Sequence, residues 1–165
     1  MTATPEHVDV LVIGAGLSGI GAACRLVTEH PERRVAVLEA RAASGGTWDL
    51  FRYPGVRSDS DMYTLGYRWR PWRGDRALAD GPSILSYVRE VAREYDVDRL
   101  VRYDHRVVGA SWDSSTALWT VEVEHAGTRT QMTTGFLWSC SGYYDYDEGY
   151  SPGFPGVADF AGQIV

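Results

Sequence analysis

Residues 7–19 read HVDVLVIGAGLSG, in which an apolar run passes directly into glycines at positions 14, 16 and 19. The run over residues 7–13 is rich in β-branched side chains, which is typical of a buried parallel strand. Residues 17–30 carry apolar side chains at helical spacing before a proline, so a helix is predicted there. Residues 34–39, RVAVLE, predict a second short strand. Together these elements indicate the strand–helix–strand unit of a parallel sheet.

Each glycine of this unit has a separate task in a dinucleotide-binding domain. Gly14 permits the tight turn, Gly16 lets the backbone approach a pyrophosphate, and Gly19 lets the helix pack closely on the sheet. Ser18 lies in the first turn of the helix, whose free N–H groups and positive dipole end would face the phosphates. The alternative is a glycine cluster that serves only a structural turn.

Glu39 closes the second strand at the distance from the glycines that such a domain requires. A carboxylate there would accept hydrogen bonds from ribose hydroxyls and repel a 2′-phosphate. The unit therefore predicts FAD or NAD at this site, and not NADP. The alternative is an ordinary exposed glutamate at a strand end.

The rest of the chain predicts further strands and one more helix. Residues 40–81 have little periodicity but many glycine, proline and aromatic residues, which favours a functional connection. A helix is predicted from Pro82, with Ser83 as its N-cap. Strands are predicted at 100–103 (parallel), at 106–112, 118–125 and 128–133 (an antiparallel meander), and at 136–139. The predicted fold class is α/β, a Rossmann-like domain with a parallel sheet plus an antiparallel β-meander.

Composition excludes several other classes of protein. All 16 basic residues are arginine, so neither a Schiff-base lysine nor a phosphate-loop lysine can occur. The net charge of −6 argues against a nucleic-acid binder. The two cysteines and four histidines have no spacing typical of a metal site, and no GxSxG motif occurs. Neither a secretory signal nor a membrane span is predicted, which favours a cytoplasmic protein.

Two further motifs narrow the assignment to a family. Residues 45–50, GGTWDL, resemble the glycine loop that runs along FAD in flavoproteins, where backbone N–H groups and the Thr47 hydroxyl can bind the cofactor. Residues 52–59, RYPGVRSD, resemble the RYPGxRxD segment of flavin-dependent Baeyer–Villiger monooxygenases, within the class B flavoprotein monooxygenases. With CSGYYDYDEGYSP at 140–152, the longer match is similar to a narrower bacterial branch that includes the ethionamide-activating monooxygenase.

The resemblance implies the first segment of a discontinuous FAD domain, over residues 1–142, in an enzyme with two dinucleotide domains. In this family NADPH reduces FAD, and O₂ is then used to oxidise a ketone or a sulfur compound. Arg57 and Ser58 would lie on the nicotinamide side, and the backbone of Val107 would contact the adenine. The cofactor-binding residues implied in the glycine loop are Gly46, Thr47, Trp48, Asp49 and Leu50.

Asp59 is the catalytic residue that the resemblance implies. It would lie beside the flavin and the nicotinamide and would orient a catalytic arginine from outside this chain. The alternative is that Asp59 only caps the turn over residues 60–63.

The last residues, 160–165, read FAGQIV and resemble the opening of the family fingerprint FxGxxxHxxxW. Residues 143–165 are therefore expected to connect to an NADPH-binding domain. Because the second glycine motif and the catalytic arginine would lie beyond this chain, we expect the chain alone not to oxidise NADPH. Two alternatives remain, a non-catalytic FAD-binding fragment and another dinucleotide oxidoreductase such as an NAD dehydrogenase, although GGTW and RYPGVRSD argue against the latter.

Overall fold

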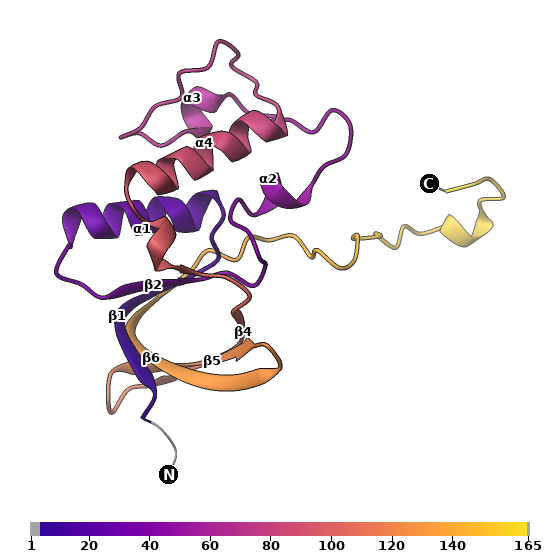
Figure 1. Cartoon of the computed structure of the whole chain (residues 1–165). Helices are drawn as coiled ribbons and strands as arrows, with labels where there is room; N and C mark the ends of the chain where they lie inside the picture. Colours follow the sequence, from indigo (N-terminus) through magenta and orange to yellow (C-terminus); the bar gives the residue numbers. More distant parts are fainter. Residues whose placement is uncertain (1–3, 165) are drawn as a thin grey trace.

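The computed structural model describes residues 4–164, which build one six-stranded sheet with helices against its parallel part (Figure 1). The strand order is β3-β2-β1-β6-β5-β4. The strands are β1 (Glu6–Ile13), β2 (Val35–Leu38), β3 (Val101–Arg102), β4 (Arg106–Asp113), β5 (Leu118–His125) and β6 (Thr128–Ser139). The helices are α1 (Leu17–Glu29), α2 (Thr47–Leu50), α3 (Met62–Leu65) and α4 (Gly81–Glu94), with 3₁₀ turns η1 (Asp98–Leu100) and η2 (Val157–Asp159).

The sheet is mixed, as the sequence predicts. β1 is parallel to β2 and to β6, and β2 is parallel to β3. β4, β5 and β6 form the antiparallel meander. The predicted α/β fold class is therefore confirmed.

β6 is one continuous strand, so the prediction of two strands at 128–133 and 136–139 was wrong. Residues 128–134 pair with β5 and residues 132–139 pair with β1, so the pairing with β5 ends just before Gly135 while the pairing with β1 continues. The hydroxyl of Thr134 donates a hydrogen bond of 3.2 Å to the carbonyl of Asp9 on β1 at this crossing. The break in apolar pattern therefore marks a change of partner and not the end of a strand.

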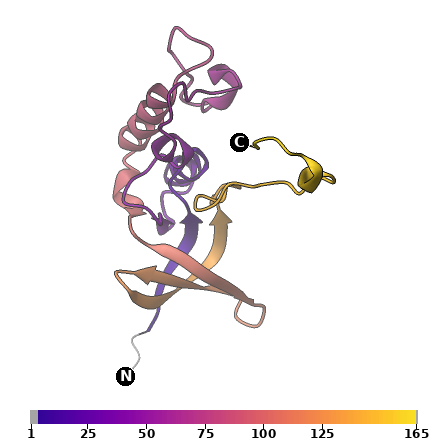
Figure 2. The same cartoon turned by 90° about the vertical axis from the view of Figure 1, so that its right-hand side faces the viewer.

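α1 and α4 cover one face of the parallel strands, while the meander curves around the opposite face (Figures 1 and 2). The helix side of the core includes Val12, Ile20, Cys24, Ile84 and Val88. The meander side is closed by Leu11, Leu38, Val121, Val123 and Met132. Burial of apolar side chains on both faces explains why the second half of β1, residues 10–13, is entirely apolar.

The N-cap of α4 lies about one helical turn before the residue that the sequence predicts. Asp80, and not Ser83, is the N-cap, and its carboxylate accepts a hydrogen bond of 2.8 Å from the N–H of Ser83. Pro82 lies in the first turn, where a missing N–H costs nothing. The predicted N-cap, Ser83, was therefore wrong, because Asp80 supplies the capping carboxylate and Ser83 supplies the N–H that it accepts from.

Residues 40–80 are ordered by aromatic packing against α4, and they contain the short helices α2 and α3, which the sequence did not predict. Tyr67 stacks on Tyr87 with ring centroids 5.7 Å apart, and its N–H donates to the Tyr87 hydroxyl at 2.7 Å. Arg70 forms ion pairs with Glu90 and Glu94 of α4. The connection is therefore structured, as its aromatic content favours.

Residues 143–164 extend away from the body of the molecule after crossing the end of the sheet (Figures 1 and 2). Apart from η2 they form no helix or strand. The domain boundary at residue 142 stays a prediction. Within residues 4–164, no helix has the length and apolar character to cross a membrane.

Candidate cofactor-binding site

A cavity of about 1170 Å³ opens at the carboxyl ends of β1, β2 and β6. This edge is where open α/β sheets bind ligands, and the volume exceeds the roughly 300–1,000 Å³ of most small-molecule pockets. Among the predicted site residues, those that line it are Gly14, Gly16, Ser18, Glu39, Gly46, Thr47, Trp48, Arg57, Ser58, Asp59 and Val107. Gly19, Asp49 and Leu50 do not line it.

The glycines divide into two groups according to what a side chain would meet. A Cβ on Gly14 would lie 2.6 Å from the Cys140 carbonyl oxygen, and one on Gly19 would lie 1.8 Å from the Gly14 carbonyl oxygen. A Cβ on Gly16 would meet only Gly46, at 3.5 Å, in ordinary contact. Gly14 and Gly19 are thus required for packing, whereas Gly16 leaves its backbone open to the cavity.

Gly16 is also the N-cap of α1, and no side chain caps this helix. The first N–H groups of a helix have no partner within it and favour an anion. Since Ser18 and Gly16 line the cavity here, the start of α1 fits a phosphate group.

Glu39 is almost fully buried, so the alternative of an ordinary exposed glutamate was wrong. Its Oε2 accepts a hydrogen bond of 2.8 Å from the N–H of Ala15, and its Oε1 accepts one of 2.9 Å from the N–H of Arg41. These contacts fix the carboxylate at the cavity edge, and each oxygen keeps a further lone pair for a ribose hydroxyl.

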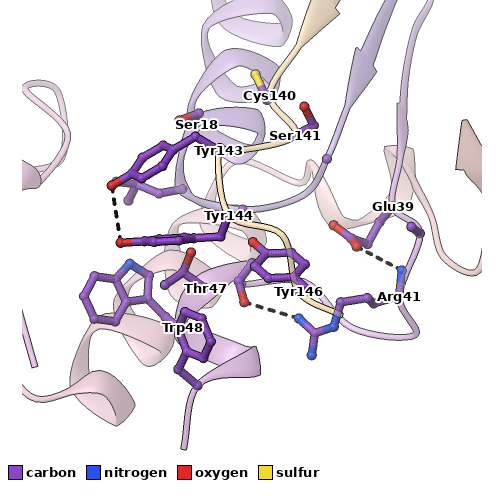
Figure 3. A pocket seen from close by; sticks show the side chains of 18 of the residues that line it. Ser18, Glu39, Arg41, Thr47, Trp48, Cys140, Ser141, Tyr143, Tyr144 and Tyr146 are labelled. Atoms are coloured by element: carbon purple, nitrogen blue, oxygen red, sulfur yellow. Dashed lines mark hydrogen bonds between the residues drawn. The ribbon is translucent and has the colours of Figure 1, made fainter. Parts of the chain in front are cut away.

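The glycine turn before α2, the helix that carries Thr47 and Trp48, is held against the first glycine turn. Gly45 and Gly46 have φ of +122° and +54°, and the N–H of Gly45 donates to the carbonyl of Ala15 at 2.9 Å. Thr47 and Trp48 consequently face the cavity (Figure 3).

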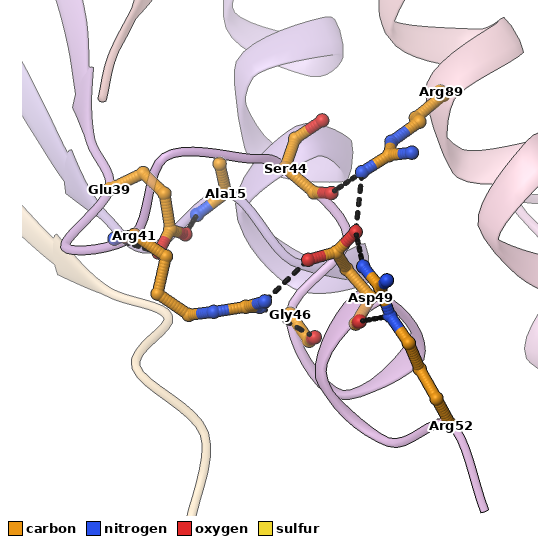
Figure 4. A network of polar contacts seen from close by, with 8 residues as sticks. All are labelled: Ala15, Glu39, Arg41, Ser44, Gly46, Asp49, Arg52 and Arg89. Carbon is orange, nitrogen blue, oxygen red and sulfur yellow. Dashed lines mark hydrogen bonds and ion pairs between the residues drawn. The ribbon is translucent and has the colours of Figure 1, made fainter. Parts of the chain in front are cut away.

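Asp49 points away from the cavity into a cluster of three arginines (Figure 4). Its carboxylate pairs with Arg41, with Nη2 of Arg89 at 2.7 Å and with Nη2 of Arg52 at 3.4 Å. Burial raises the pKa of the Asp49 carboxyl, but hydrogen bonds and charges from Arg41 and Arg89 outweigh it and hold that pKa below its usual value. The implied direct contact between Asp49 and the cofactor does not agree with this orientation.

This ion cluster predicts a pH-dependent stability. Because the pKa of Asp49 is lowered by folding, its stabilising effect is present above the unfolded pKa of about 3.9 and is lost as pH falls through the folded value. We expect the difference in free energy of unfolding between wild type and Asp49→Asn to be largest near neutral pH and to shrink in acid. Urea denaturation between neutral and acid pH measures this difference, and a constant one would contradict the prediction.

The segment with the RYPG motif forms the far wall of the cavity. Ser58 is buried there, and its Oγ accepts a hydrogen bond of 3.2 Å from the N–H of Ala79. Asp59 is exposed and lines the cavity. The N-cap of the following helix α3 is Asp61, which accepts a hydrogen bond of 2.9 Å from the N–H of Thr64. The alternative of Asp59 as the capping residue was therefore wrong.

Several residues that line the cavity were not predicted. Arg41 follows Glu39 closely, and no motif singles it out. The chain after β6 also crosses the cavity and brings Tyr143, Tyr144 and Tyr146 to it (Figure 3). Phe51 lies edge-on to Tyr144 with centroids 5.8 Å apart. The aromatic run YYDYDEGY was the available signal for this wall, but from the sequence it is assigned to the resemblance and to a connecting segment, and not to the cavity.

The described residues hold no group of three or more His, Cys, Asp or Glu side chains that could bind a metal ion. His105 lines the cavity beside Val107 and stacks on His125 with centroids 4.1 Å apart. Nδ1 of His105 lies 2.6 Å from the carbonyl of Tyr103, which accounts for one ring nitrogen.

Comparison with known proteins agrees with this geometry. Residues 12–74 match the family model described as an NAD(P)-binding Rossmann-like domain. The chain is 54% identical over 160 residues to the FAD-containing monooxygenase EthA of Mycobacterium tuberculosis, covering 97% of this chain and 33% of that protein. Over nearly its whole length, the chain is thus similar to part of an FAD-containing monooxygenase. It spans about a third of the length of these curated relatives.

Solved monooxygenase structures share the fold. A steroid monooxygenase bound to NADP has a TM-score of 0.77 at 31% identity, covering 96% of this chain and 30% of its own. A cyclohexanone-bound cyclohexanone monooxygenase has a TM-score of 0.74 at 26% identity, covering 97% of this chain and 30% of its own. The resemblance to Baeyer–Villiger monooxygenases, carried by GGTWDL and RYPGVRSD, is therefore confirmed.

Proposed function

We propose that this chain is the FAD-binding N-terminal part of an NADPH- and O₂-dependent monooxygenase. The observation that carries the proposal is the cavity at the sheet edge, where the uncapped start of α1, the buried Glu39 and the Gly16–Gly46 contact line one continuous wall. An extended dinucleotide needs a phosphate site, a ribose site and open backbone between them. EthA, which is named as FAD-containing, supports FAD as the resident group.

Within this cavity the described residues divide the binding of FAD among them. Gly14, Gly16 and Ser18 would bind the pyrophosphate, and Glu39 would bind the adenosine ribose. The Thr47 hydroxyl and the backbone of Val107 would bind further along the cofactor. FAD, when bound, supplies hydride acceptance from NADPH and the reaction with O₂, while the protein orients it and excludes water. Arg57, Ser58 and Asp59 would lie on the nicotinamide side.

The substrate class that we propose is a small ketone or a sulfur compound. The cyclohexanone bound to a related monooxygenase supports a ketone. The aromatic wall of Phe51, Tyr53 and Tyr144 would give such a molecule an apolar surface.

Titration of the chain with FAD tests the proposal. We expect FAD to bind more tightly than NADP⁺, and Glu39→Arg to weaken FAD binding at least about tenfold, because ribose hydrogen bonds are lost. Quenching of flavin fluorescence gives the FAD affinity of each chain, and displacement of bound FAD by NADP⁺ gives the NADP⁺ affinity. Unchanged FAD affinity in Glu39→Arg, or preference for NADP⁺ in the wild type, would count against the assignment.

Glu39 also holds the N–H groups of Ala15 and Arg41, so loss of folding must be separated from loss of binding. Glu39→Gln keeps one acceptor oxygen and serves as the milder variant. Its thermal midpoint reports the structural cost, and its FAD affinity at a temperature where it is folded reports the ribose contact.

A further inference from the structure

Arg41 occupies the cavity wall between the ribose site and the phosphate site. Its N–H donates to Oε1 of Glu39 at 2.9 Å, and its Nη1 donates to the carbonyl of Gly46 at 3.2 Å. Gly46 in turn lies against Gly16, the N-cap of α1. The guanidinium therefore binds the residue that lies against the N-terminus of α1, where the first N–H groups have no partner within the helix.

The Arg41 guanidinium has donors left for a ligand. Among residues 4–164, its side chain donates to Gly46 and to Asp49, which accounts for two of the five N–H groups of a guanidinium. The side chain is 27% exposed and lines the cavity. A planar guanidinium with free N–H groups matches the geometry of a phosphate.

Asp49, whose carboxylate does not line the cavity, pairs with this guanidinium. Its side chain is 5% exposed, its Oδ2 pairs with Arg41, and its Oδ1 pairs with Arg89 and Arg52. Arg89 belongs to α4 and also donates to the carbonyl of Ser44 at 2.8 Å, which anchors the whole loop to the helix. Three guanidinium groups share one carboxylate, so the cluster keeps excess positive charge beside the cavity.

We propose that Asp49 is a positioning residue that fixes the Arg41 guanidinium in the cavity wall, where Arg41 binds the phosphate on the adenosine side of the dinucleotide. This inference deepens the proposed function and rests on it. Asp49 itself does not touch the ligand, since its carboxylate is buried and engaged by arginines. It acts by removing the conformational freedom of a long side chain before binding.

Binding of ADP and of adenosine to the full chain separates this role from a general structural one. We expect Arg41→Gln to weaken ADP binding about tenfold, the scale of one lost hydrogen bond between charged groups, and to leave adenosine binding unchanged. Asp49→Asn should weaken ADP binding in the same direction. The double variant should bind ADP no more weakly than Arg41→Gln alone, because both changes act on the same contact between Arg41 and the phosphate.

Arg52→Gln is the matched control. Arg52 pairs with the same carboxylate, but its side chain is 76% exposed and does not line the cavity, so ADP affinity should stay at the wild-type value. Arg41→Lys should recover only part of the affinity, because an ammonium lacks the planar fork. Thermal midpoints of all variants check folding, and Arg41→Gln alone decides the phosphate contact if Asp49→Asn does not fold.

The outcomes separate the two proposals. A wild-type chain that binds neither FAD nor ADP would overturn the proposed function. A wild-type chain that binds ADP, together with Arg41→Gln of equal affinity, would overturn only the role of Arg41. Equal losses for ADP and adenosine in Arg41→Gln would also overturn it, since they would indicate a deformed cavity without a phosphate contact.

Discussion

In the full-length monooxygenase that we propose, replacing Asp59 by alanine should lower oxygenation about 100-fold, the scale of one lost electrostatic stabiliser, while FAD stays bound. A carboxylate on the nicotinamide side can hold a cationic side chain by a charge-assisted hydrogen bond. That cation would stabilise the negative charge that develops during oxygen transfer. Product formation per bound FAD measures the effect.

The geometry of Asp59 supports this expectation. Its side chain lines the cavity, and among residues 4–164 it forms no ion pair within 4.0 Å, so the carboxylate is available to a partner. Asp61, two residues later, is the cap of α3 and accepts from both the N–H and the hydroxyl of Thr64. Two neighbouring carboxylates therefore have separable tasks.

Asp61→Ala is the matched control for Asp59→Ala. It removes a helix cap and should lower the thermal midpoint, but it should leave turnover close to wild type. If Asp59→Ala forms product at nearly the wild-type rate, the catalytic role is contradicted. If Asp59→Ala instead lowers the thermal midpoint as Asp61→Ala does, Asp59 is structural.

The first strand, helix and second strand could be predicted because their signals are local. An apolar run, three glycines and helical periodicity lie within 40 consecutive residues, and each constrains its own backbone. β6 shows where local signals fail. Its interruption at Gly135 resembles a strand end, yet pairing with β1, more than a hundred residues earlier in the chain, keeps it extended.

The same limit applies to the candidate site. Motifs place Thr47, Trp48 and Asp49 in one loop, but they do not tell which side chains face the cavity. Asp49 turns away because Arg89, forty residues later, attracts its carboxylate, and that contact depends on the position of α4. Arg41 and the tyrosines after β6 reach the cavity for a similar reason, since only the folded chain brings them there.

Gly19→Ala should destabilise the fold by about 3 kcal/mol or more, whereas Gly16→Ala should leave stability nearly unchanged and weaken FAD binding. A methyl group on Gly19 would lie 1.8 Å from the carbonyl oxygen of Gly14, and both groups are backbone-fixed. Since helix α1 must then move away from the turn, the apolar contacts beneath it are lost. For a chain of this size the thermal midpoint should fall by about 10 °C.

Gly16→Ala tests the cavity without the clash. Its Cβ would meet only Gly46 at 3.5 Å, and Gly16 has a φ of −79° that alanine adopts readily. The methyl group would instead occupy the approach to the first turn of α1, so FAD affinity should fall about tenfold or more while the thermal midpoint without FAD holds. Full FAD affinity in Gly16→Ala would place the pyrophosphate elsewhere, and an unchanged thermal midpoint in Gly19→Ala would mean that the turn can open. The pair therefore separates the packing task of one glycine from the binding task of the other, at two positions three residues apart in the same motif.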